Sequence, residues 1–131
     1  MGRTILAILT GFITWSILWF ALNGVLNAGF SEYIQENGAI TNTGVLMMIL
    51  IGSVVISIIS GYVTAVIARD EILKHTLIFG VINLAVGIFF QSQAWDLLPL
   101  WYHLSFLILL IPAIIYGGKL REQRIGELAS A

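Results

Sequence analysis

Four long runs of apolar residues alternate with shorter polar segments along the chain. A helix needs about 20 mostly apolar residues, each adding about 1.5 Å, to cross a bilayer. Four segments meet this length and predict membrane-spanning helices over residues 4–26, 45–68, 76–94 and 97–116. None of these segments contains aspartate, glutamate, lysine or arginine. We therefore predict an all-α integral membrane protein, a single domain over residues 1–131 folded as an antiparallel four-helix bundle.

The segments between the apolar runs predict how the helices are connected. The connections before and after the third run are short, so the helices that they join should be antiparallel neighbours. The loop between the first and second runs, residues 29–42, is longer, and the orientation derived below places it on the outer side. In this loop Ser31 can cap a short surface helix over residues 32–37, which Gly38 ends.

The fourth apolar run contains two features that interrupt a regular helix. Pro112 should kink this helix, because proline cannot donate the hydrogen bond that the helix needs at that position. A static bend is favoured over a gating hinge. We expect Gly117 and Gly118 to end the helix, as glycine often does. A polar tail follows over residues 121–131, with helical character over 120–128.

The distribution of lysine and arginine predicts the orientation of the helices. Four alternating spans bring all six basic residues to one side: Arg3, Arg69, Lys74, Lys119, Arg121 and Arg124. The opposite side carries Glu32, Glu36 and Asp96 and no basic residue. Because basic residues are retained on the cytoplasmic side, both termini are predicted in the cytoplasm. The pattern is typical of a bacterial inner membrane.

Composition supports this placement and limits the chemistry. Of the 131 residues, 59% are hydrophobic and 10% are charged, whereas soluble domains are usually about 45–50% apolar and about 25% charged. A domain of this size has too little interior to bury so much apolar surface, so the bilayer must cover the rest. The net charge of −1 gives no strong field for binding nucleic acid. The absence of cysteine excludes disulfides and thiolate metal sites.

Small residues recur at every fourth position of the second apolar run. Residues four apart share one face of a helix, where small side chains allow a neighbouring helix to approach closely. With two glycines of the third run, the candidates for helix packing or for a subunit interface are Ser53, Ser57, Gly61, Ala65, Gly80 and Gly87. Packing within one chain is the favoured interpretation, and an interface with another subunit is the alternative.

Asn83 lies near the middle of the third apolar run, about 12 Å from its cytoplasmic end. An amide at this depth is costly unless it is hydrogen-bonded, so it should face the bundle or a wet cavity. The favoured interpretation is a structural hydrogen bond to Ser57, Ser60 or Thr14. The functional alternative is an intramembrane polar path lined by Asn83, Gln91, Ser60 and Thr64.

The two histidines raise the question of a haem, since opposed imidazoles can ligate iron. His75 begins the third span at the cytoplasmic side, whereas His103 lies roughly 24 Å above the cytoplasmic end of the fourth. The two rings therefore cannot share one iron, and no metal or cofactor site is predicted. We expect His75 among the interfacial charges that precede it, and His103 in the outer aromatic belt beside Trp101 and Tyr102.

These observations leave the activity open. No ionisable acid or base lies deep in a span, which counts against proton-coupled transport, and no catalytic residues can be assigned. We expect an accessory or scaffolding subunit whose partners are the bilayer and other membrane subunits or a second copy. A homo-oligomeric channel or carrier for a neutral solute is the alternative, followed by a membrane enzyme or cofactor-binding subunit.

Overall fold

The computed structural model describes residues 2–34, 40, 42–93 and 95–130. This part of the chain folds into four long helices, joined in part by short 3-10 turns: α1 (Gly2–Gly29), η1 (Ser31–Tyr33), α2 (Thr43–Ala68), α3 (Ile72–Gln93), η2 (Trp95–Leu97) and α4 (Leu100–Ser130). All four α-helices are long and apolar enough to cross a membrane. The prediction of an all-helical, multi-pass membrane protein is confirmed at this level.

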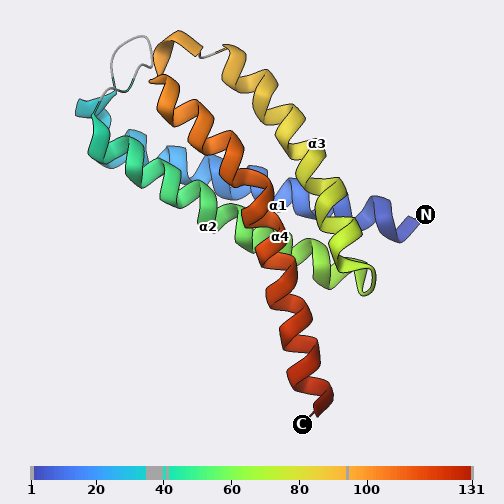
Figure 1. Ribbon diagram of the computed structural model, residues 1–131. Coiled ribbons are helices and arrows are strands. Elements are labelled where there is room, and N and C mark those ends of the chain that lie inside the picture. Colours follow the sequence, from blue (N-terminus) through green and yellow to red (C-terminus); the bar gives the residue numbers. More distant parts are fainter. Residues whose placement is uncertain (1, 35–39, 41, 94, 131) are drawn as a thin grey trace.

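The helix α4 is longer than the apolar run that predicts it. It continues without a break through Pro112 and both following glycines to Ser130, and its last part projects beyond the other helices (Figure 1). The prediction that Gly117 and Gly118 end this helix is wrong. A side chain at Gly117 would collide with the carbonyl oxygen of Ile58 in α2, so this glycine permits a close contact, and the good helix formers that follow extend the helix.

The connections before and after α2 contain a short bridge, a helix cap and a residue with positive φ. In the loop between α1 and α2, Ile34 and Ile40 form an isolated antiparallel bridge. Of the surface helix predicted over residues 32–37, the described residues form only the 3-10 turn η1 and this bridge, and residues 35–37 lie outside the described part of the chain. Asn42 caps α2, because its side-chain oxygen accepts a hydrogen bond of 3.0 Å from the amide of Val45. Between α2 and α3, Arg69 adopts a positive φ of 70°, and its amide donates the last hydrogen bond of α2, to the carbonyl of Ala65.

The central helix of the bundle is α2, which packs most extensively on α4 and α1. Its closest contact with α4 is reciprocal: a side chain at Gly61 would meet the carbonyl of Ile114, and one at Gly117 would meet that of Ile58. The two backbones therefore touch, as small residues allow within membranes. The helix α3 packs more on α4 than on α2, although a short turn joins it to α2.

The helix α1 lies at the edge of the bundle. Its buried residues are Ala7, Gly11 and Leu26, while Ile17 and Phe20 are 62% and 73% exposed. In a span these exposed apolar side chains are suited to contact with lipid. The helix α1 packs mainly on α2 and shares few contacts with α3.

Candidate functional site

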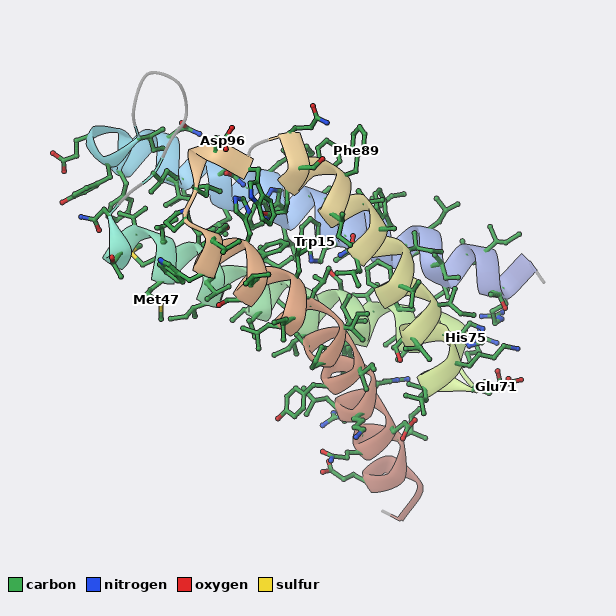
Figure 2. All side chains as sticks on the ribbon, turned by 45° about the horizontal axis from the view of Figure 1, so that its top comes forward. Trp15, Met47, Glu71, His75, Phe89 and Asp96 are labelled. Carbon is green, nitrogen blue, oxygen red and sulfur yellow. The ribbon has the colours of Figure 1, made fainter. Side chains whose placement is uncertain are left out.

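A cleft of about 300 Å³ lies between α1, α3 and α4, and we call it the lateral cleft. Its lining is mostly apolar, and none of the side chains that line it is charged. Seven aromatic side chains contribute to its walls: Phe12, Trp15, Trp19, Phe20, Phe90, Tyr102 and Phe106. In Figure 2 Trp15 lies in the interior of the molecule, among the helices, whereas Phe89 lies on the outer side of α3.

The lateral cleft opens sideways. Phe20 on α1 and Phe90 on α3 both line it and are 73% and 64% exposed. At the back of the cleft Tyr102 and Phe106 of α4 are 2% and 3% exposed. Because Phe20 and Phe90 belong to apolar candidate spans, the opening between them is placed to face hydrocarbon. The cleft is thus accessible to molecules dissolved in a bilayer.

Two tryptophans of α1 form a fixed wall of the cleft. The rings of Trp15 and Trp19 stack with centroids 5.3 Å apart, and both meet Phe106 edge-on, at 6.2 Å and 5.5 Å. The Nε1–H group of Trp15 also donates a hydrogen bond of 3.1 Å to Ser57 Oγ. This bond fixes the orientation of the indole, because an N–H group buried in an apolar bundle needs an acceptor.

Asn83 lines the lateral cleft and lacks the hydrogen bonds predicted for it. Its side chain is 2% exposed, and among the described residues its amide nitrogen Nδ2 has no hydrogen-bond partner. None of the three hydroxyls predicted as partners bonds to this nitrogen: Thr14 and Ser57 donate to the carbonyls of Thr10 and Ser53, and the buried Oγ of Ser60 itself has no partner among the described residues. An unpartnered buried donor costs about 1–3 kcal/mol, so this amide needs an explanation.

At the other end of the cleft, Oε1 of Gln91 is paired with Nδ1 of His103. The other ring nitrogen, Nε2, donates to the carbonyl oxygen of Trp95 at 3.1 Å, and the imidazole stacks on the Trp95 indole at 4.4 Å. His103 is fully buried and lies among the aromatic rings of Trp95 and Tyr102, so its side chain points into the bundle, and its place in an outer aromatic belt stays a prediction. A polar ring gains more from these internal partners than from lipid.

The other histidine also has internal partners. His75 is 5% exposed, its Nδ1–H donates to the carbonyl of Glu71 at 2.9 Å, and its Nε2 lies 3.0 Å from the hydroxyl of Thr4. Because a carbonyl can only accept, Nδ1 carries a proton in this contact. His75 thus ties α1 to α3 near the basic end of the molecule.

The residues predicted for a polar path are not all brought together. Asn83 and Gln91 line the lateral cleft, whereas Ser60 and Thr64 do not. Both are fully buried on α2, where Thr64 donates to the carbonyl of Ser60. A side chain at Gly11 of α1 would collide with the Thr64 hydroxyl, so Thr64 lies in the contact between these two helices.

The small residues proposed for packing or for an interface lie in contacts within the chain. Ser53, Ser57 and Ala65 are buried on α2. A side chain added at Gly80 would lie 3.4 Å from Cγ1 of Ile111. Gly87 lines the lateral cleft, near Phe106 and other side chains of α4.

The cleft itself was not predicted from the sequence. Trp15 and Trp19 are four residues apart on one helix face, with Phe12 one turn earlier. This aromatic face of the first helix is the feature of the sequence that could have indicated the cleft. Among the described residues no three histidine, cysteine, aspartate or glutamate side chains group as metal ligands would. The groups that line the cleft are aromatic rings, aliphatic side chains, two side-chain amides and the hydroxyls of Ser16 and Tyr102.

Comparison with known proteins places the chain in no family, since no family model matches it and no similar curated protein or solved structure was found. The class of the protein therefore follows from its own fold and site. It is an all-helical protein with four candidate membrane spans and an uncharged, largely aromatic cleft beside α1.

Proposed function

We propose that this integral membrane protein binds a small lipophilic molecule, taken up from the bilayer, in the lateral cleft. The observation that carries the proposal is the buried Nδ2 of Asn83, which has no hydrogen-bond partner among the described residues, beside an apolar cleft with exposed Phe20 and Phe90 at its opening. Binding sites for small molecules are typically apolar concavities with a few placed polar groups. The cleft combines both features.

The size of the cleft limits the part of the ligand that it can hold. Its volume of about 300 Å³ lies at the lower end of the range of about 300–1,000 Å³ typical of ligand pockets. It is roughly twice an apolar cavity of about 150 Å³ that takes up benzene. We expect the cleft to hold a body of about two rings, while any longer chain extends into the bilayer.

The orientation proposed from the basic residues places the cleft in the outer half of a bacterial inner membrane. Arg3 donates to the carbonyl of Ile67 at 2.9 Å, and the guanidinium of Arg121 lies 5.9 Å from the centre of the Tyr62 ring. These contacts gather basic residues at one end of the bundle, which supports a cytoplasmic location for that end. The cleft is lined by the middle of α1, the second half of α3 and the first half of α4, away from this end.

Photolabelling with benzophenone tests the proposed binding. The protein in lipid nanodiscs is illuminated with benzophenone, and the modified residues are located by peptide mass spectrometry. We expect adducts on the residues that line the cleft. Ser16→Trp should reduce this labelling, because Ser16 lines the cleft and an indole there would fill it. Ile17→Trp adds the same ring at a position 62% exposed and should leave labelling unchanged.

Two labelling results would contradict binding in the cleft. Adducts spread over the lipid-facing surface, for example at Ile108, which is 68% exposed, would show that the probe samples the surface without a site. If Ser16→Trp also left the pattern unchanged, the cleft would not be a binding site and the proposal would be wrong.

A second candidate is an accessory subunit of a larger membrane assembly, favoured by the course of α4. Residues 122–127 are exposed on the part of α4 that extends beyond the bundle (Figure 1), where another subunit has access to them. Purification of the tagged protein in a gentle detergent, with native mass determination, tests this candidate. A stoichiometric unlike partner supports it, whereas a monomer or a closed homo-oligomer contradicts it.

A further inference from the structure

The polar groups of the lateral cleft indicate the chemistry of its ligand, an inference that rests on the proposed function. Two side-chain amides line the cleft, and they differ in their partners. Gln91 is hydrogen-bonded to His103, while Nδ2 of Asn83 has no partner among the described residues. An amide nitrogen is a donor only. The ligand atom that lies next to Asn83 must therefore be a hydrogen-bond acceptor.

The orientation of Asn83 is not a general property of asparagine in these helices. Asn23 and Asn27 of α1 donate to carbonyls four residues earlier, those of Trp19 and Asn23, at 2.9 Å and 2.8 Å. The same backbone bond from Asn83 would reach the carbonyl of Phe79, and the structure shows no such bond. Asn83 thus lines the cleft, and its Nδ2 does not use the acceptor that its own helix offers.

The acceptor should belong to an uncharged group. None of the side chains that line the cleft is charged, so an ionised ligand would have no counter-charge there. Burying an unpaired charge in apolar surroundings is far more costly than burying a hydrogen-bonded neutral group. A carbonyl, ether or hydroxyl oxygen meets this condition, and a carbonyl does so without adding a donor that would itself need a partner.

The depth of Asn83 distinguishes a free lipophile from a phospholipid. Because α3 runs from Ile72 to Gln93, Asn83 lies about 15–17 Å from either end, close to the middle of a hydrocarbon core about 30 Å thick. The ester oxygens of a phospholipid remain at the membrane surface, and its acyl chains carry no acceptor at mid-depth. An acyl chain in the cleft would leave Asn83 unpartnered, so it does not fit.

The walls of the cleft favour a flat ligand. Trp15 and Trp19 present stacked indoles, with Phe106 at their edge, and the hydrogen bond to Ser57 holds the first of these rings in place. Aromatic rings gain most from other flat rings in offset or edge-on contact. We infer that the ligand is an uncharged, ring-bearing lipophile whose carbonyl oxygen accepts a hydrogen bond from Nδ2 of Asn83.

A matched pair of competitors tests this inference. In the benzophenone assay, 1-tetralone supplies two fused rings with one carbonyl, and tetralin supplies the same rings without oxygen. At equal concentrations in the bilayer, 1-tetralone should compete about tenfold better, as one hydrogen bond to a buried amide allows. Asn83→Leu should remove this preference and retain competition by tetralin. Asn27→Leu is the control, because Asn27 bonds to its own helix outside the cleft.

The outcomes separate the inference from the proposed function. Equal competition by both compounds in the unmodified protein would overturn the inference, with Asn83 then satisfied by water or by a polar group of another chain, while ligand binding in the cleft would stand. Competition by neither compound, with labelling spread over the lipid-facing surface, would overturn the proposed function as well. The comparison in the unmodified protein decides the inference even if Asn83→Leu fails to fold.

Discussion

The contact between α2 and α4 provides a sharp test of the packing described above. The variant Gly61→Ala adds one methyl group at the point where a side chain would collide with the backbone carbonyl of Ile114. Unlike a flexible side chain, this carbonyl cannot rotate away, so the two helices must separate. At Gly24 of α1 no heavy atom lies within 4 Å of the added carbon, which makes Gly24→Ala a matched control.

The expected magnitude follows from two opposing effects. Alanine stabilises a helix by up to about 1 kcal/mol relative to glycine, and this gain applies to both variants. Overpacking a close contact costs about 1–3 kcal/mol, and the upper part of this range applies because the obstacle at Gly61 is backbone. We expect Gly61→Ala to lower the free energy of unfolding by about 2 kcal/mol and Gly24→Ala to leave it unchanged or raise it by up to about 1 kcal/mol.

Unfolding by sodium dodecyl sulfate in mixed micelles, followed by circular dichroism, measures this difference. Gly80→Ala adds a useful intermediate case, since its methyl group would lie 3.4 Å from Cγ1 of Ile111, an ordinary contact. The expected order of stability is therefore Gly24→Ala, Gly80→Ala and Gly61→Ala, from highest to lowest. If Gly61→Ala were as stable as Gly24→Ala, the backbone contact between α2 and α4 would not exist as described.

Three further substitutions test the polar contacts, each by the same unfolding measurement. Asn83→Leu should raise the free energy of unfolding by about 1–3 kcal/mol, because it removes an unpartnered buried donor, and no gain would mean that this amide is satisfied. Trp15→Phe should lower the free energy of unfolding by about 1 kcal/mol more than Trp19→Phe, because it also removes the hydrogen bond to Ser57. Equal losses of stability would count against that bond. His103→Leu should cost about 1–3 kcal/mol, because it deprives the carbonyl of Trp95 of its donor, whereas a lipid-facing histidine would show little change.

The four helices could be predicted from the sequence because hydropathy and length decide whether a segment can span a bilayer. The end of α4 could not be predicted in this way. Hydropathy falls after Tyr116, and Gly117 resembles a helix terminator, yet this glycine lies against the carbonyl of Ile58. A sequence alone does not show whether a glycine ends a helix or allows another helix to approach, because only the partner helix distinguishes the two roles.

The site was less predictable than the fold, for a similar physical reason. Asn83 stood out as a polar residue at mid-depth, but whether it bonds to a neighbouring hydroxyl depends on how the helices pack. Thr14 and Ser57 donate to carbonyls of their own helices, and Nδ2 of Asn83 has no hydrogen-bond partner among the described residues. The burial of His103 depends on a partner twelve residues away, Gln91 of α3, and hydropathy carries no information on such a pair.

The placement of the lateral cleft connects ligand binding to the stability of the bundle. The helices α1 and α3 share few contacts, and the cleft lies between them and α4, so a bound molecule would add contacts where the protein itself has few. A ligand that binds only the folded state at one hundred times its dissociation constant stabilises that state by about 2.7 kcal/mol. This gain is comparable to the cost of about 1–3 kcal/mol for an unpartnered amide. The empty protein would thus carry an unfavourable Asn83 that the ligand satisfies, and Asn83→Leu should stabilise the protein while removing its preference for a carbonyl compound.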